Sequence, residues 1–338
     1  MSGTARRGLC VFGAGLDSLA AAGEAADRAG FDAVWASELY NRSATVTLAT
    51  LAPRTERAKL GSGIIYGVGR SPLMLAAEAA DLDEASGGRF ILGLGNGTRR
   101  MISDWHGLDG DAPAVRMEEL VPLLRRIWRL PEEPVDHDGR FYHLKLAALD
   151  RSGAMPEIPI YTAGVGARMI ETAGRVADGL IAHTMCVPRY LEDVARPAVE
   201  RGAAKAERDP GAVAIATFAL ACAAPDADVA RREAAAMIAF YGTVKSYAVV
   251  FEHCGFGAEA KAIQEAFAKR DLAAMVGAVS EAMVDEFAAA GTPEEVDASL
   301  RRYDGVVDEV VLSVPSFQVT DERVAENLAL LTERCAPA

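Results

Sequence analysis

Short apolar segments alternate with longer segments of mixed polarity along the chain. The apolar segments are continuous and do not alternate with polar residues, which is typical of strands covered on both faces. We therefore expect parallel strands separated by helices, the arrangement of an α/β protein. The predicted strands are residues 8–15, 33–38, 59–66, 90–95, 158–163, 179–183, 213–221 and 307–314.

Capping residues and glycines mark the boundaries of the predicted helices. Asp17 can cap a helix that ends at Gly30. Ser71 followed by Pro72 is typical of an N-cap and the first position of a second helix. Gly87 should end that helix, because glycine readily adopts the left-handed conformation of a C-cap.

Two intervals between strands are longer than the roughly 30 residues of a strand–helix unit. The first holds an insertion at about 131–157, which reads as a hairpin around Asp138-Gly139, and the second an insertion at about 226–291 with a helical pattern. Removing about 100 inserted residues from 338 leaves about 240, the size of a (β/α)8 TIM barrel. We predict a single TIM-barrel domain over 1–338, and an open doubly wound sheet is the alternative.

The charge balance narrows the partners that the protein can have. There are 35 basic and 48 acidic residues, giving a net charge of −13. Bulk attraction to nucleic acid or to an anionic membrane is therefore disfavoured. No run reaches the roughly 18 apolar residues of a membrane-spanning helix, and we read the N-terminal apolar stretch as a strand rather than a signal peptide.

The cysteines and histidines argue against a disulfide framework and a metal site. Five widely spaced cysteines without a Cys-x-x-Cys motif favour a reducing, cytoplasmic environment. The five histidines are not clustered at metal-ligand spacing, so we expect no metal.

In a TIM barrel, ligands bind at the carboxyl ends of the strands, and two of these ends are rich in glycine. Backbone N–H groups in such turns can hold a phosphate, helped by the dipole of the following helix, although tight turns of the barrel rim would have the same composition. Neither turn has the glycine spacing of a Rossmann fingerprint. The two turns are Gly95-Asn96-Gly97-Thr98 and Ala163-Gly164-Val165-Gly166.

Two titratable side chains at strand ends are candidate catalytic groups. Glu38 follows the second strand and could act as an acid or base, accept a hydrogen bond from a cofactor, or form a rim salt bridge. His183 ends the sixth strand and could instead be a satisfied core or rim histidine. His106 is expected to pack in a loop. The side chains expected to shape the substrate pocket are Tyr40, Tyr66, Trp105 and Met185.

Several motifs together resemble the luciferase-like monooxygenase superfamily. They are Gly30-Phe31-Asp32-x-Val34-Trp35, Leu82-Asp83-Glu84-x-Ser86-Gly87-Gly88-Arg89-Phe90-x-Leu92-Gly93-Leu94-Gly95, Ile158-Pro159-Ile160-Tyr161, Glu171-Thr172-Ala173-Gly174-x-Val176-Ala177-Asp178-Gly179 and Ala290-Gly291-Thr292-Pro293-Glu294-Glu295-Val296. The chain is most similar to the deazaflavin-dependent branch, which includes methylenetetrahydromethanopterin reductase.

This resemblance implies a TIM barrel, usually a homodimer, that binds FMN or the deazaflavin coenzyme F420. The cofactor phosphate would lie on the two glycine-rich turns. In the family, the end of the third strand carries a non-prolyl cis peptide that backs the flavin-like ring; here it would be Gly63-Ile64, beside Ser62. The deazaflavin branch commonly has an acid followed by a histidine after strand two, whereas this chain has Glu38 followed by Leu39.

The sequence leaves three functional hypotheses. The favoured one is hydride transfer between F420 and a small organic substrate, in which Glu38 orders the ring face or shuttles a proton, or His183 takes the missing histidine's place. The second is an FMN-dependent two-component monooxygenase supplied by a separate reductase. The third is a flavin-binding relative without catalysis, which Leu39 motivates. The identity of the substrate lies beyond what the sequence determines.

Overall fold

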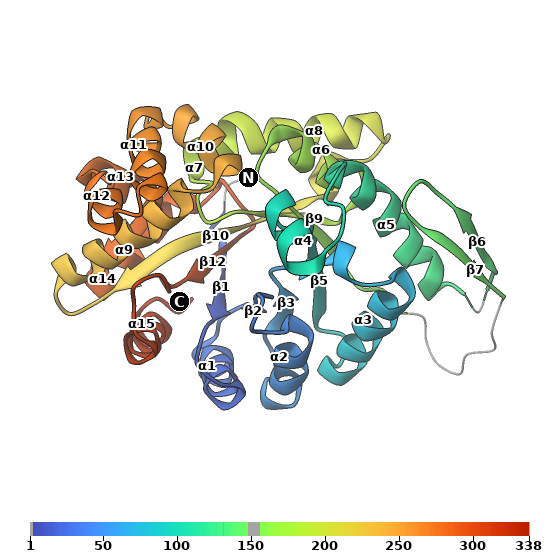
Figure 1. The fold of residues 1–338 in the computed structure, drawn as a ribbon. Helices are drawn as coiled ribbons and strands as arrows, with labels where there is room; N and C mark the ends of the chain where they lie inside the picture. The colour runs from blue at the N-terminus through green and yellow to red at the C-terminus, as the bar shows by residue number, and fades with distance from the viewer. Residues whose placement is uncertain (1–2, 131, 148–155, 338) are drawn as a thin grey trace. The chain divides into compact units, whose positions relative to one another are not determined.

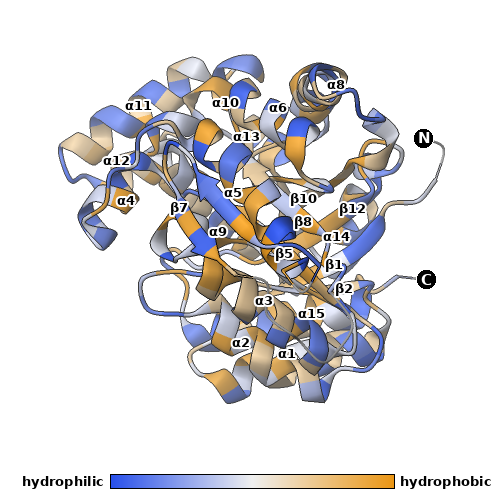
Figure 2. Ribbon diagram, turned by 90° about the vertical axis from the view of Figure 1, so that its right-hand side faces the viewer, coloured by the Kyte–Doolittle hydropathy of each residue, from blue (hydrophilic) through white to orange (hydrophobic). Residues whose placement is uncertain are grey.

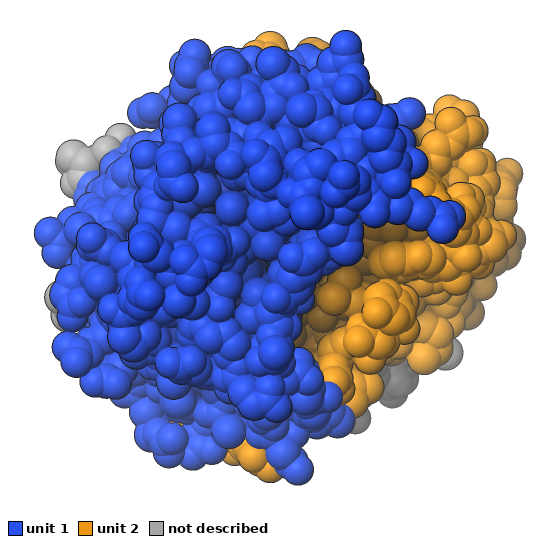
Figure 3. Space-filling view, turned by 60° about the vertical axis from the view of Figure 1, so that its left-hand side comes forward, with its two compact units in different colours: residues 1–35, 182–197, 215–338 blue, residues 36–181, 198–214 orange. Residues whose placement is uncertain are grey.

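The computed structural model describes residues 3–130, 132–147 and 156–337, and the chain divides into two compact units. Unit 1 contains residues 1–35, 182–197 and 215–338, and unit 2 contains residues 36–181 and 198–214 (Figure 3). Parallel strands alternate with helices in both units (Figure 1). The predicted α/β alternation is therefore confirmed.

Unit 1 is built on a parallel sheet with the strand order β11-β10-β12-β1-β2. Arg6 of β1 pairs with Glu309 of β12, and Ala216 of β10 pairs with the same residue from the other side. The strands are β1 (Arg6–Val11), β2 (Ala33–Ala36), β10 (Ala214–Ala223), β11 (Ala288–Gly291) and β12 (Glu309–Ser313). The helices beside them are α1 (Leu16–Ala29), α7 (Pro188–Tyr190), α14 (Pro293–Leu300) and α15 (Asp321–Arg334).

The insertion predicted at about 226–291 is helical, as expected, and belongs to unit 1. Its helices are α9 (Ala227–Gly242), α10 (Ala248–His253), α11 (Gly257–Ala268), α12 (Leu272–Gly277) and α13 (Glu281–Phe287). The insertion ends with strand β11, which pairs in parallel with β10 and was not predicted. Its sequence is three alanines and a glycine, residues with little strand propensity, so only the pairing with β10 makes it a strand.

Unit 2 carries the parallel strand order β3-β5-β8-β9, with the short strand β4 also paired to β5. The strands are β3 (Lys59–Ser62), β4 (Ile65–Tyr66), β5 (Phe90–Gly95), β8 (Ile160–Gly164) and β9 (Gly179–Ala182). The helices are α2 (Ala44–Leu51), α3 (Pro72–Ser86), α4 (Arg99–His106), α5 (Pro113–Trp128), α6 (Ala167–Val176) and α8 (Arg196–Lys205), which begins at the end of unit 1.

The hairpin predicted within 131–157 is confirmed. Strands β6 (Val135–Asp138) and β7 (His143–Leu146) are antiparallel and pair Val135 with Leu146. Residues 131 and 148–155 of the predicted insertion lie outside the described residues.

Helix α1 begins one residue before Asp17, so the predicted cap is wrong. The N-cap is Gly15, and the Ser18 hydroxyl both donates to the Gly15 carbonyl oxygen (2.8 Å) and accepts from the Gly15 N–H (3.2 Å). Asp17 lies in the first turn, where a negative charge favours the helix dipole. The predicted boundaries of α3 are confirmed, with Ser71 as the N-cap and Gly87 as a left-handed C-cap.

Hydrophobic residues predominate in strands such as β5 and β10, whereas β7 and the helices show hydrophilic and hydrophobic residues side by side (Figure 2). All six residues of β5 are buried, in agreement with the continuous apolar pattern that predicted it. Among the described residues, no single helix is long and apolar enough to cross a membrane. One helix pair, Ala227–Gly242 with Lys245–His253, meets that length and composition jointly, but it is bent by 100°.

Candidate active site

A hollow of about 670 Å³ in unit 2 lies where the segment after β2 meets the end of β4 and the last turn of α4. We call it the Glu38 pocket. Three of the four side chains predicted to shape a substrate pocket, Tyr40, Tyr66 and Trp105, line it. Its complete lining is Glu38, Leu39, Tyr40, Asn41, Arg42, Ser43, Tyr66, Gly69, Arg70, Trp105 and His106.

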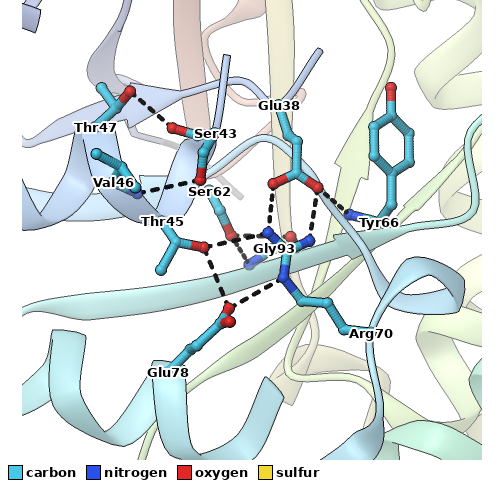
Figure 4. Close-up of polar contacts among 10 residues, drawn as sticks. All are labelled: Glu38, Ser43, Thr45, Val46, Thr47, Ser62, Tyr66, Arg70, Glu78 and Gly93. Atoms are coloured by element: carbon cyan, nitrogen blue, oxygen red, sulfur yellow. Dashed lines mark hydrogen bonds and ion pairs between the residues drawn. The ribbon is translucent and has the colours of Figure 1, made fainter. Parts of the chain in front are cut away.

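Glu38 is held in a two-pronged ion pair with Arg70 (Figure 4). The Arg70 Nη1 and Nη2 atoms each donate to one carboxylate oxygen at 2.7 Å, and the Tyr66 N–H donates to Oε1 at 3.2 Å. The Glu38 side chain is only 9% exposed. Such parallel, charge-assisted hydrogen bonds fix both position and charge, and the hydrogen bond to Glu38 is the largest cause that raises the pKa of Arg70.

A second carboxylate completes the contacts of the guanidinium. Arg70 Nε donates to Glu78 Oε2 at 3.0 Å, and the Thr45 hydroxyl donates to the same oxygen at 3.3 Å. The network thus ties the segment after β2 to helices α2 and α3 (Figure 4). Since the guanidinium is shared between two carboxylates, it is not available as a cationic ligand for the pocket.

Both oxygens of Glu38 accept charge-assisted hydrogen bonds from Arg70. A carboxylate held in this way is fixed in position, and both of its oxygens are already engaged. The geometry therefore favours the ordering role considered for Glu38 over the proton-shuttling role. The same geometry includes the salt bridge that the sequence analysis gave as an alternative role for Glu38.

A tight turn presents the side chains that follow Glu38. The Leu39 N–H donates to the Arg42 carbonyl oxygen (3.0 Å), and the Arg42 N–H donates to the Leu39 carbonyl oxygen (3.2 Å). Within this turn Leu39 is 43% exposed and Tyr40 80% exposed. Both side chains are thus available to a ligand in the pocket.

Aromatic rings form the rim of the pocket. Tyr40 and Trp105 meet edge to face with ring centroids 5.6 Å apart, and Tyr66 and His106 do so at 5.4 Å. Burial is the main cause that raises the pKa of Tyr66 to about 12, so its phenol stays protonated at neutral pH. His106 was expected to pack in a loop, which is wrong: it is the last residue of α4 and lines the pocket.

The Gly63-Ile64 peptide bond is cis, at the position that the family resemblance implied. The Ser37 hydroxyl donates to the Gly63 carbonyl oxygen (2.8 Å), and the Glu38 N–H donates to the Ile64 carbonyl oxygen (3.3 Å). The neighbouring Ser62 hydroxyl donates to the Gly93 carbonyl oxygen (2.9 Å) and accepts from the Gly93 N–H (2.8 Å). The Ser62 side chain, predicted to bind cofactor, therefore bridges β3 and β5.

The first glycine-rich turn leads from β5 into α4. Gly97 has a φ of +64°, and a Cβ there would lie 2.8 Å from the Tyr66 ring, so glycine is required at this position. The Thr98 hydroxyl caps α4 by accepting from the Met101 N–H (3.2 Å). Asn96 Nδ2 donates to the Pro113 carbonyl oxygen (3.1 Å), while its buried Oδ1 has no hydrogen-bond partner among the described residues.

The second glycine-rich turn leads from β8 into α6. Gly166 is the N-cap of this ten-residue helix and has extended backbone angles. A Cβ built on Gly166 meets no atom within 4 Å, so open space lies beside the helix N-terminus. Thr162, just upstream in β8, has a buried hydroxyl without a hydrogen-bond partner among the described residues.

His183 and Met185 belong to unit 1, whereas the site residues described so far belong to unit 2. The His183 ring stacks on Tyr247 at a centroid distance of 4.0 Å and meets Tyr241 edge to face at 4.7 Å. Its Nδ1 accepts from the Met185 N–H at 3.2 Å, which leaves the proton on Nε2. Burial lowers the pKa of His183 to about 3, so the imidazole is neutral at physiological pH, and Met185 is fully buried.

Arg70 is the functional residue that the sequence reading missed most clearly. It stands directly before the Ser71 N-cap, between the end of the third predicted strand and a helix. The only signal in the sequence that could have indicated a role for it is a basic residue near the end of a predicted strand. The pairing with Glu38 spans 32 positions, however, and no local pattern reports it.

The alternating parallel strands and helices, with a pocket beside the segment that follows a strand, are those of an α/β barrel enzyme. The family model described as "Luciferase-like monooxygenase" matches residues 3–309, and the chain therefore belongs to the luciferase-like monooxygenase family. Members of this family and its structural neighbours are oxidoreductases. The resemblance read from the motifs is thereby confirmed.

Two groups of relatives illustrate the similarity. An uncharacterized protein of Mycobacterium tuberculosis is 34% identical over 91% of this chain and 94% of its own length. The 5,10-methylenetetrahydromethanopterin reductase of Methanolobus tindarius is 35% identical over 81% of this chain and 83% of its own length.

Solved structures establish the fold. The coenzyme F420-dependent tetrahydromethanopterin reductase of Methanopyrus kandleri matches with a TM-score of 0.81 and 27% identity, covering 99% of this chain and 98% of that one. An F420-dependent secondary alcohol dehydrogenase matches with a TM-score of 0.73 at 20% identity over 98% of both chains, and therefore shows the fold alone. The chain has the predicted (β/α)8 TIM-barrel fold.

Proposed function

We propose that the protein is an F420-dependent oxidoreductase that transfers a hydride between the deazaflavin and a small organic substrate bound at the Glu38 pocket. The observation that carries this proposal is the 35% identity over 81% of the chain to a methylenetetrahydromethanopterin reductase. The structurally similar tetrahydromethanopterin reductase of Methanopyrus kandleri is dependent on coenzyme F420. The substrate and the cofactor of this chain are the proposed part.

The residues at the strand ends fit a phosphate-bearing, flavin-like molecule. Open space lies beside Gly166 at the N-terminus of α6, where backbone N–H groups and the helix dipole favour an anion. The unpartnered acceptor Asn96 Oδ1 needs a donor, and the unpartnered Thr162 hydroxyl can pair with either a donor or an acceptor. A cofactor with ring N–H groups, sugar-alcohol hydroxyls and a phosphate offers all of these.

The roles proposed for the chain's own residues follow from their contacts. Gly95, Gly97, Ala163, Gly164 and Gly166 would supply backbone close to the cofactor. Val165 and Thr98 would lie beside its phosphate, and Asn96 would accept a hydrogen bond from it. Gly63 and Ile64 would back its ring. When bound, F420 supplies two-electron hydride chemistry.

Around the substrate, the chain would order and shelter the reacting groups. Arg70 fixes the Glu38 carboxylate, and this pair would keep the segment 37–43 in place against the end of β4. The exposed rings of Tyr40 and Trp105 would cover an apolar substrate and exclude water. His183 and Met185 remain candidates in unit 1, His183 as a neutral hydrogen-bonding imidazole rather than an acid.

An FMN-dependent two-component monooxygenase is the second candidate. Its support is a fold match to an FMN-containing Baeyer–Villiger monooxygenase, with a TM-score of 0.68 and 18% identity. Both cofactors carry a phosphate at the end of a ring system, so the glycine-rich turns suit either. A non-catalytic flavin-binding relative is the third candidate. The 31–35% identities to named reductases favour F420 over both.

Assembly and surroundings are further proposals. We propose a homodimer in the cytoplasm, without nucleic-acid or membrane partners, that is supplied by a separate flavin or F420 reductase. None of the five cysteines, all of which lie in the described residues, forms a disulfide, which suits a reducing compartment. Sedimentation that finds only monomer would refute the dimer.

Cofactor titration tests the proposed function. Purified protein is titrated with F420 and separately with FMN, and binding is followed by tryptophan fluorescence. We expect the dissociation constant for F420 to be at least tenfold lower than that for FMN. Tight FMN binding without F420 binding, together with oxygen consumption on addition of reduced FMN, would favour the monooxygenase instead.

A matched pair of variants tests the proposed phosphate position. Gly166→Ala adds a methyl group to open space and should leave F420 affinity within about threefold. Gly166→Asp places a carboxylate there and should weaken F420 binding at least tenfold by charge repulsion. Aspartate is a good N-cap, so α6 should remain folded in this variant. Equal affinities in the two variants would place the phosphate elsewhere.

A further inference from the structure

We propose that His106 is the proton-transferring residue of the Glu38 pocket and that the substrate is an uncharged, ring-bearing ketone or aldehyde, or the corresponding alcohol. This inference rests on the proposed function, because the hydride comes from reduced F420. It adds the proton donor and the substrate class, neither of which follows from membership of the family.

His106 differs from the other histidines of the chain in its contacts. The imidazoles of His137, His143 and His253 lie 3.0, 2.6 and 3.0 Å from the carboxylates of Glu119, Asp138 and Asp193. His183 is neutral, stacks on Tyr247 and meets Tyr241 edge to face. His106 is exposed, lines the pocket, and has no hydrogen-bond or ion-pair partner among the described residues.

The position of the His106 ring is nevertheless defined. It packs edge to face against Tyr66, with an interplanar angle of 61°, and a Cβ built on Gly69 would lie 3.6 Å from its Cε1 and Nδ1 atoms. It also occupies the last turn of α4, which fixes its backbone. An imidazole held by ring contacts keeps both nitrogens available for a ligand.

The other titratable groups of the pocket are poorly suited to deliver a proton. Glu38 and Arg70 are bound to each other, and Tyr66 has a raised pKa of about 12. Leu39 carries no exchangeable proton. The remaining charged or titratable groups of the pocket lining are Tyr40 and Arg42, and on α4 itself Arg100 pairs with Asp104.

The character of the pocket indicates an uncharged substrate with a ring. The Glu38 carboxylate and the Arg70 guanidinium are bound to each other and so do not offer an ionic partner to a ligand, and the rim consists of the rings of Tyr40, Trp105, Tyr66 and His106. Aromatic rings favour stacking or edge contacts with another ring. A carbonyl group is the simplest acceptor that needs both a hydride and a proton.

The proposed step is balanced. Reduced F420 is oxidised and delivers a hydride to the carbonyl carbon, so the carbon–oxygen π bond breaks and its electron pair moves to oxygen. The imidazolium of His106 gives its proton to that oxygen, forming the alcohol and leaving a neutral imidazole. In the reverse direction, neutral His106 removes the hydroxyl proton while oxidised F420 takes the hydride.

The experiment uses the full chain with F420 and two probes, acetophenone and cyclohexanone, together with their alcohols. Ketone reduction requires imidazolium and should slow as pH rises, whereas alcohol oxidation requires neutral imidazole and should speed up. His106→Gln should lower kcat about 10²- to 10³-fold, leave KM and the F420 dissociation constant within about threefold, and remove both pH dependences. His143→Gln, on the exposed hairpin, is the matched control and should behave as wild type.

A binding readout makes the inference independent of turnover. The imidazole Cε1–H signal of His106, assigned by its loss in His106→Gln, should shift when acetophenone is added to the F420 complex, and that of His143 should not. Any one of three results would overturn the inference: a His106 signal that does not shift, a kcat of His106→Gln within threefold of wild type, or no reduction of either ketone. If F420 binds in those cases, the proposed function is not affected. If F420 does not bind, the inference and the proposed function both fail.

Discussion

Replacing Arg70 with methionine tests the central contact of the Glu38 pocket. Methionine keeps the apolar length of the side chain and removes the guanidinium. The Glu38 carboxylate then loses two hydrogen bonds of 2.7 Å and keeps only the Tyr66 N–H, at 3.2 Å. Because Glu38 is only 9% exposed, water cannot fully replace the lost partner.

The expected cost can be worked from these contacts. Breaking a buried ion pair by removing one partner costs about 3–5 kcal/mol, since it leaves an uncompensated charge. Arg70 is 20% exposed, so solvent screens part of the interaction. We therefore expect Arg70→Met to lower the free energy of unfolding by about 2–4 kcal/mol. Adding Glu38→Gln should restore about 1–2 kcal/mol, because the unpaired charge is gone.

Urea denaturation of each variant, followed by tryptophan fluorescence, measures these differences. Arg28→Met is the matched control: its ion pair with Glu24 is equally short, at 2.7 Å, but Arg28 is 69% exposed, so we expect a loss under about 0.5 kcal/mol. A loss under about 0.5 kcal/mol for Arg70→Met, or a double variant less stable than Arg70→Met alone, would show that burial does not strengthen the Glu38–Arg70 pair.

Three further outcomes are expected. Gly97→Ala should lower the free energy of unfolding by about 1–3 kcal/mol, because it forces a side chain into a positive φ and against Tyr66; unchanged urea midpoints would contradict this. Ser62→Ala should lower the free energy of unfolding by about 1–3 kcal/mol, because it leaves the buried Gly93 N–H and carbonyl groups without the Ser62 hydroxyl. The F420 affinity should stay within threefold. A loss of F420 affinity without a loss of stability would indicate that Ser62 binds the cofactor. The pKa of His183 is about 3 in the folded state, so below about pH 6.5 only the unfolded state gains this proton. The free energy of unfolding should therefore fall as the pH drops from 6.5 towards 3, by at most about 1.4 kcal/mol per pH unit. A His183→Gln variant whose free energy of unfolding falls equally steeply with pH would refute this.

The sequence predicted the strands well because their signal is local. Each of the eight predicted segments overlaps a strand in the structure, because a run of consecutive buried apolar residues is typical of a strand covered on both faces. Strand β11 was missed because Ala288–Gly291 becomes a strand only through its pairing with β10. The start of α1 was misplaced because Ser18, three residues along, satisfies the turn at Gly15.

The candidate site was harder to predict because it depends on contacts between distant residues. Glu38, Tyr40, Tyr66 and Trp105 could be chosen from their positions at or near strand ends, and they line one pocket. What the sequence could not show is which polar groups already have partners. The Ser62 and Thr98 hydroxyls, both predicted to bind cofactor, bond to backbone groups of this chain.

Such existing contacts separate groups that hold the site together from groups that can act on a ligand. A carboxylate bound on both oxygens, as in Glu38, is costly to move and contributes mainly position. An imidazole placed only by ring contacts, as in His106, can change its hydrogen bonds and its proton at little cost to the fold. The same distinction applies to Asn96, where one end of the amide is anchored and the buried oxygen has no donor in the part of the chain that the structure describes. Ligand chemistry should therefore be sought first at His106 and Asn96, with Glu38 and Arg70 as the frame that holds the pocket open.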